Sequence, residues 1–115
     1  MIKKKFGSFD LFDIAGASKN ISSPKHEDEK HVVMENIATS IQLHHISTVI
    51  LSNHIDCGAY GGSARFKDKT AEILFHTKEL LKAKKIVQKK FPYLIVKTIF
   101  ISKNKNGTLK IVNLK

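Results

Sequence analysis

The sequence predicts an α/β fold, a three-layer sandwich with a mostly parallel sheet and an antiparallel edge strand at its C-terminal end. Three observations support this prediction. Short apolar runs rich in β-favouring residues recur along the chain, segments with helical periodicity separate them, and an Asn-Gly pair near the end is typical of a hairpin turn. The length of 115 residues suits a single domain that covers residues 1–115.

The first half of the chain contains one predicted strand and one predicted helix. Residues 8–15 read as a short strand that ends at Gly16, and residues 16–20 form a loop. A helix is expected to begin near Ser23, because serine is a good N-cap and Pro24 suits the first helical position. Its buried stripe consists of apolar residues at helical spacing: Val33, Met34, Ile37, Ala38 and Ile41.

The second half continues with a strand, a helix and a hairpin. Residues 47–52 include the uninterrupted run Val-Ile-Leu, which is typical of a strand covered on both faces. Residues 68–91 are predicted to be a helix that Asp68 caps and Pro92 stops. Residues 94–101 and 108–114 follow as strands around the Asn-Gly turn. The buried stripe of the second helix consists of Ile73, His76, Leu80, Ala83 and Val87.

The net charge is +10, from 20 basic and 10 acidic residues. Such a balance suits a polyanionic partner, but 19 of the basic residues are lysine and no aromatic residues are interleaved with them. We therefore expect no nucleic-acid partner. No run is long and apolar enough for a membrane span, and the basic start lacks the apolar segment of a secretory signal. These features predict a cytoplasmic protein without a membrane partner.

The stretch NHIDCGAYGG, residues 53–62, follows the predicted central strand and holds the only cysteine of the chain. Ligands of open α/β sheets bind outside the carboxyl ends of the strands, where His54 and Cys57 fall. Histidine and cysteine are preferred zinc ligands, and the glycines of this stretch allow a close approach of the backbone. Two ligands are half of a zinc site, and a buried spacer, which is the ordinary role of a single cysteine, or a reactive thiol are the alternatives for Cys57.

Residues 49–59, VILSNHIDCGA, resemble the second zinc motif of the β-class carbonic anhydrases, in which an apolar strand ends in His-x-x-Cys-Gly. Residues 10–17, DLFDIAGA, are similar to the strand and small-residue turn that precede it in that family. Small carbonic anhydrase-like proteins resemble the chain more closely still. In them DCGAYG is followed by a helix that carries Glu and His, as Glu72 and His76 do here.

The resemblance implies a zinc ion held by His54, Cys57 and a further cysteine, hydration of carbon dioxide to bicarbonate as the reaction, and a homodimer. The chain departs from the family pattern, because it lacks the first motif, Cys-x-Asp-x-Arg, and its sole arginine, Arg65, follows the zinc motif. Two explanations are open. The chain is N-terminally incomplete relative to the family, or it has lost the chemistry and is a non-catalytic remnant or interaction protein. A lysine-rich polyanion-binding protein is a third alternative.

Six further residues are expected to line the pocket or to support the metal ligands: Asp13, Gly16, Asp56, Gly58, Tyr60 and His76. Ordinary structural roles compete with these assignments. Asp56 can cap a following helical turn through nearby amides, Tyr60 can pack the loop onto the core, and His76 can be a buried histidine satisfied by a hydrogen bond.

Overall fold

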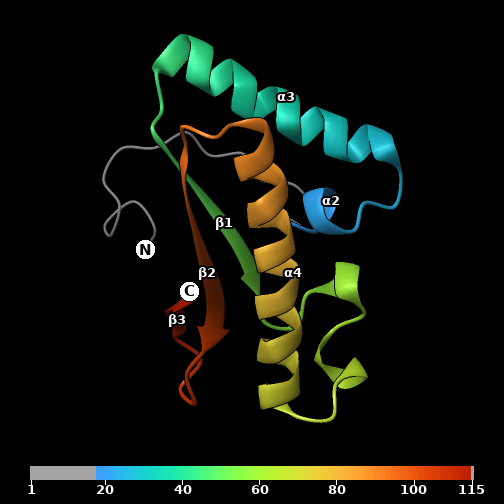
Figure 1. The fold of residues 1–115 in the computed structure, drawn as a ribbon. Helices are drawn as coiled ribbons and strands as arrows, with labels where there is room; N and C mark the ends of the chain where they lie inside the picture. Colours follow the sequence, from blue (N-terminus) through green and yellow to red (C-terminus); the bar gives the residue numbers. More distant parts are fainter. Residues whose placement is uncertain (1–17, 115) are drawn as a thin grey trace.

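The computed structural model describes residues 18–114, which form a three-stranded sheet with helices packed against it (Figure 1). The strands are β1 (Thr48–His54), β2 (Ile95–Lys103) and β3 (Leu109–Leu114), in the order β1-β2-β3. β1 and β2 are parallel, with Thr48 opposite Ile95 and His54 opposite Ile101. β3 runs antiparallel to β2 at the sheet edge. The α/β class and the antiparallel C-terminal strand are therefore confirmed.

A mostly parallel sheet is not confirmed, because the described strands form one parallel and one antiparallel pair. The strand predicted at residues 8–15, and Gly16 at which it was predicted to end, lie outside the described residues. The hairpin has the expected turn, in which Gly107 adopts a positive φ of 86° and its backbone N–H donates to the carbonyl of Asn104.

Three α-helices are described: α2 (Lys19–Ser22), α3 (Glu27–His44) and α4 (Lys69–Lys90). α4 lies along β1 and β2, while α3 crosses near one end of α4 (Figure 1). Buried side chains from the three helices form one hydrophobic cluster with Leu51 of β1 and Val96 of β2. Leu51 and Val96 share a sheet face, because Val49 pairs with Val96 and alternate residues of a strand point the same way. The described helices thus make one layer, and the third layer is not confirmed.

The start of α3 corrects the prediction that a helix begins near Ser23. Ser23 instead follows α2, a short helix at residues predicted in part to be a loop, and its hydroxyl donates to Glu79 Oε1 at 2.9 Å. The N-cap of α3 is His26, whose backbone N–H donates to Glu29 Oε1 at 2.9 Å. This hydrogen bond lowers the pKa of Glu29. The serine side chain is therefore used to join two helices rather than to cap one.

α4 and the strand that precedes it follow the prediction closely. Asp68 is the N-cap of α4 and accepts a hydrogen bond from the backbone N–H of Ala71 at 2.8 Å. β1 extends two residues beyond the predicted end, so that His54 is its last residue. Four residues of the predicted stripe of α4 are buried, namely His76, Leu80, Ala83 and Val87. Among the described residues, no helix combines the length and the hydrophobicity that a membrane span requires.

Candidate metal centre

The candidate ligands lie where the chain leaves β1 at the carboxyl end of the parallel strand pair. Two short 3₁₀ helices follow β1: η1 (Gly58–Tyr60) and η2 (Ser63–Arg65). The carbonyl of Cys57 accepts hydrogen bonds from the backbone N–H groups of Tyr60 and Gly62 at 3.1 and 2.9 Å. The loop between β1 and α4 is therefore an ordered connection built around the backbone of Cys57.

His54 is exposed at the end of β1, and its ring is oriented by the backbone. Nδ1 lies 2.8 Å from the carbonyl oxygen of Ile55. A carbonyl oxygen only accepts, so Nδ1 carries a proton in this contact, and in the neutral ring Nε2 keeps its lone pair. Metal-binding histidines are commonly oriented by such a hydrogen bond.

Cys57, in contrast, is buried, with 4% of its surface exposed. Among residues 18–114, no group of three or more His, Cys, Asp or Glu side chains could hold a metal ion. The donor types of His54 and Cys57 suit zinc, but the described residues do not complete a tetrahedral site. A shared metal ion at these two residues stays a prediction.

Asp56 and Glu72 hold the loop in place through backbone amides. Asp56 has a positive φ of 58°, and its backbone N–H donates to Glu72 Oε2 at 2.8 Å. Asp56 Oδ1 accepts from the backbone N–H of Ser63 at 2.7 Å, and the Ser63 hydroxyl donates to both oxygens of Glu72 at 2.9 and 3.0 Å. Asp56 therefore contacts the first amide of η2, as a capping aspartate does.

The two glycines Gly62 and Gly58 differ in whether the loop could accept a side chain at their position. Gly62 has a φ of 76°, and a Cβ atom there would lie 3.0 Å from Asp56 Oδ1. A side chain at Gly62 would strain the backbone and press on the carboxylate that accepts from η2. A Cβ atom at Gly58 would meet no atom within 4 Å, so the described structure imposes no close approach there.

A buried polar group lies beside the loop, between β1 and α4. The amide Nδ2 of Asn53 donates to His76 Nδ1 at 3.0 Å and contacts the Tyr60 hydroxyl at 3.5 Å. The Tyr60 and His76 rings meet edge to face with centroids 5.0 Å apart, and the His76 ring lies 5.0 Å from that of Phe100. His76 therefore packs as a core aromatic residue with one hydrogen bond.

Burial dominates the protonation of these groups. Removal from water lowers the pKa of His76, although the carboxylate of Glu72 opposes the change. Burial also raises the pKa of Tyr60 to about 12. Both side chains are neutral near pH 7 as a result. In the described structure His76 Nε2 and Asn53 Oδ1 have no hydrogen-bond partner, which is uncommon for buried polar atoms.

Arg65, the only arginine of the sequence, contacts both the loop and α4. Arg65 Nη1 donates to the carbonyl of Tyr60 at 2.8 Å, and the guanidinium carbon lies 5.0 and 4.5 Å from the ring centroids of Phe66 and Phe75. Cation–π contacts of this kind favour a fixed side-chain position. Within residues 18–114, the contacts of Arg65 are thus with the loop and α4 and not with an aspartate.

The structure brings together most of the residues predicted around the ligands. Asp56, Tyr60 and His76 all lie in or against the loop, whereas Asp13 and Gly16 lie outside the described residues. Sequence reasoning missed the polar contacts of Asn53 and Ser63. The burial of Asn53 could have been predicted, because Asn53 lies two residues after Leu51 and therefore on the same core-facing side of β1.

Known proteins match this chain over most of its length. A family model described as "Putative carbonic anhydrase" matches residues 2–113, nearly the whole chain. An uncharacterized protein of Rickettsia bellii (strain RML369-C) is 33% identical over 96 residues, which cover 81% of this chain and 58% of that protein. An uncharacterized protein of Rickettsia conorii (strain ATCC VR-613 / Malish 7) is 30% identical over 97 residues, or 82% of this chain and 52% of the relative.

The chain spans little more than half the length of these curated relatives. No solved structure matches it significantly.

Proposed function

The chain belongs to the Putative carbonic anhydrase family, and on that premise we propose that it supplies His54 and Cys57 to a zinc centre that hydrates carbon dioxide to bicarbonate. The observation that carries the proposal is the end of β1. There a histidine with a free Nε2 is followed by a buried cysteine whose loop is fixed by hydrogen bonds. Zinc in a centre of this kind supplies a nucleophile for hydration at neutral pH.

The other ligands come from outside residues 18–114 in this proposal. Cys57 is the only cysteine in the sequence, so a second thiolate requires either a longer protein or a second copy of the chain. The relatives extend well beyond the matched region, which leaves room for the former. A homodimer would allow ligands to come from a second copy, since each copy would bring its own His54 and Cys57 to the interface.

The chain's own residues orient His54 and shield Cys57 from water. The Ile55 carbonyl fixes the His54 ring, and the Asp56, Ser63 and Glu72 contacts fix the turn that carries Cys57. The packed rings of Tyr60 and His76 close the side of the loop that faces α4. Ligands held in this way lose little conformational freedom when they bind a metal ion.

Metal analysis of the purified chain tests the proposal. We expect zinc in the wild-type protein and a loss of at least tenfold in zinc affinity for His54→Ala and for Cys57→Ser, because each removes one ligand. The control is His31→Ala, which removes an exposed histidine of α3 and should retain zinc. Sedimentation with and without zinc shows whether the metal ion joins two copies. Wild-type protein that binds no zinc would exclude the arrangement in which a second copy completes the site, and zinc affinity that is unchanged in both His54→Ala and Cys57→Ser would contradict the proposal in either arrangement.

A second candidate is a non-catalytic member of the family, such as an interaction protein. Two observations favour it: no three metal-binding side chains meet within residues 18–114, and Arg65 contacts the Tyr60 carbonyl and two aromatic rings. The two candidates differ in carbon dioxide hydration by zinc-loaded protein. Full zinc occupancy without hydration would favour the non-catalytic candidate.

A further inference from the structure

β1 pairs with a strand on only one of its two sides within residues 18–114, where the sheet order is β1-β2-β3. The backbone N–H of Ile55, just after β1, donates to the carbonyl of Ile101 in β2 at 2.8 Å. Because backbone groups alternate in direction along a strand, the N–H and C=O groups of the odd-numbered residues of β1 face β2. Those of the even-numbered residues, such as Ile50 and Ser52, face away from β2, along what we call the outer edge of β1.

The outer edge of β1 has none of the features that usually keep an edge strand from pairing. Such features are lysines, prolines and bulges, which interrupt the row of backbone groups or make it repulsive. β1 has the sequence TVILSNH, without lysine or proline, and its register with β2 is unbroken from Thr48 to His54. A row of backbone donors and acceptors on a regular apolar strand is a template for a further strand.

Ser18 shows where the preceding chain meets this edge. Ser18 is buried, and its hydroxyl donates to the carbonyl of Ser52 at 3.2 Å. The three residue steps from Ala15 to Ser18 span at most about 11 Å, so the strand predicted at residues 8–15 ends near the carboxyl half of β1. A strand that ends there lies alongside β1 if it runs parallel to it. An antiparallel strand would extend past the end of β1 instead.

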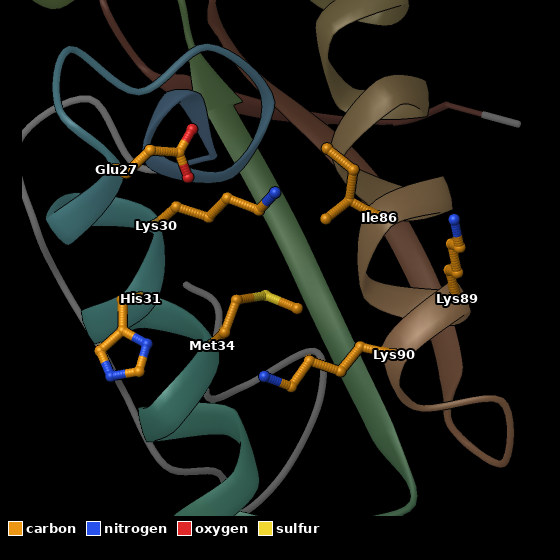
Figure 2. Close-up of a pocket in the computed structure, with 7 residues that line it drawn as sticks. All are labelled: Glu27, Lys30, His31, Met34, Ile86, Lys89 and Lys90. Carbon is orange, nitrogen blue, oxygen red and sulfur yellow. The ribbon is translucent and has the colours of Figure 1, made fainter.

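The handedness of the chain selects the same edge. Connections between parallel strands of one sheet are right-handed in nearly all proteins. α4 connects β1 to β2 over one face of the sheet, and α2 and α3 share a hydrophobic cluster with α4, Leu51 and Val96 on that face. Met34 of α3 and Ile86 of α4 line a surface depression between the two helices (Figure 2). A right-handed connection through α2 and α3 therefore starts from a strand on the side of β1 opposite β2.

We propose that residues 8–15 occupy the outer edge of β1 as a further parallel strand, which makes the sheet order 8–15, β1, β2, β3. The segment SFDLFDIA is rich in β-favouring residues and contains no proline. This placement brings Asp13 and Gly16 to the same carboxyl edge of the sheet as His54. It also gives the sheet two parallel pairs and one antiparallel pair. The proposal does not depend on zinc binding or on catalysis.

Nuclear magnetic resonance on the full chain tests the proposal in two ways. Amide hydrogen exchange of Ile50 and Ser52 should be at least about 100-fold slower than in an unstructured peptide, because both N–H groups donate to the added strand. Nuclear Overhauser contacts should connect backbone protons of residues 8–15 with those of residues 48–54. Both measurements are made on the wild-type protein, so they need no variant that folds.

Proline substitutions in the segment provide the second arm. Successive N–H groups of a strand alternate in direction, so one of Leu11→Pro and Phe12→Pro removes a donor to β1 in either register. That variant should accelerate exchange of the Ile50 amide at least tenfold. The matched control is Lys4→Pro, which lies outside residues 8–15 and should retain wild-type exchange. The Leu51 amide faces β2 and should be protected in every variant, which checks that the fold is retained.

Three outcomes would overturn the proposal. The first is exchange of the Ile50 and Ser52 amides at the rate of an unstructured peptide. The second is protection of these amides that neither Leu11→Pro nor Phe12→Pro changes. The third is contact between residues 8–15 and β1 that appears only between differently labelled chains in a mixed sample, because the strand would then come from a second copy.

Discussion

At the scale of single residues, the distinctive feature is a neutral histidine in the core. His76 has 0% of its surface exposed and makes a hydrogen bond with Asn53, yet its Nε2 has no partner in the described structure. Protonation would place a charge among the rings of Tyr60, Phe75 and Phe100. The unfolded chain has no such penalty, so folding and protonation of this side chain oppose each other.

The stability of the protein should therefore fall with acidification. The folded-state pKa of His76 lies below the ordinary value of 6.5. The unfolded state thus binds more protons below pH 6.5, and the contribution of neutral His76 is complete above that pH and lost as the pH falls towards the folded-state pKa. One such group changes the free energy of unfolding by at most about 1.4 kcal/mol per pH unit. Urea unfolding between pH 7.5 and 5 measures this slope.

His76→Gln should flatten the pH dependence, because it removes the titrating group and keeps an acceptor for Asn53. His31→Gln, which removes an exposed histidine, serves as the control and should retain the wild-type slope. An identical slope in wild type and His76→Gln would contradict the assignment.

At the scale of elements, one side chain of α4 holds the loop that follows β1. Glu72 lies in the first turn of α4, and it is buried with its oxygens accepting from Asp56 and Ser63. His76 lies four positions after Glu72, so one face of α4 contacts both the loop and the polar group under it. The first two turns of the helix and the loop therefore act as one structural unit.

Glu72→Ala should loosen this unit. The Asp56 N–H and the Ser63 hydroxyl would lose their acceptor, which costs about 1–3 kcal/mol for a buried group. Hydrogen exchange of the Asp56 amide should accelerate at least tenfold, whereas amides of α3 should be unaffected. Glu35→Ala, an exposed change on α3, is the control and should leave the exchange of the loop unchanged. Wild-type exchange of the Asp56 amide in Glu72→Ala would rule out the proposed support.

At the scale of the whole molecule, one hydrophobic cluster joins the helices to the sheet. Ile21 of α2, Met34 of α3 and Leu80 of α4 belong to it together with Leu51 of β1. Hydrogen bonds from Ser22 and Ser23 to Glu79 Oε1, at 3.0 and 2.9 Å, join α2 to α4 beside this cluster. The described elements should therefore unfold together rather than one by one.

Two leucines of α4 provide a matched test of this cluster. Leu80 has 0% of its surface exposed, whereas Leu74 on the same helix has 57%. Leu80→Ala should cost about 2–5 kcal/mol in free energy of unfolding, because it removes buried methyl groups and leaves a cavity. Leu74→Ala should change it by less than about 0.5 kcal/mol. Chemical unfolding monitored by circular dichroism measures both, and a small loss in Leu80→Ala would contradict a single cooperative core.

The sequence by itself determined the elements whose signals are local. Asp68 caps α4 and Pro92 follows its end because capping and the missing proline N–H act within a few residues. The Asn-Gly turn placed the final hairpin for the same reason, and the His-x-x-Cys motif pointed to the correct family. The burial of His76 also followed from its spacing along the helix.

Only the tertiary structure decided where polar side chains were used. Ser23 is an adequate N-cap in isolation, but its hydroxyl meets Glu79 across 56 residues, and α3 begins at Glu27 instead. Ser63 and Glu72 likewise meet only because the loop folds back on α4. The surface depression lined by Met34 and Ile86 likewise forms only because α3 crosses near one end of α4. A polar or charged side chain interacts with the groups that tertiary packing brings near it. The spacing of residues along the sequence does not determine which distant residues become neighbours.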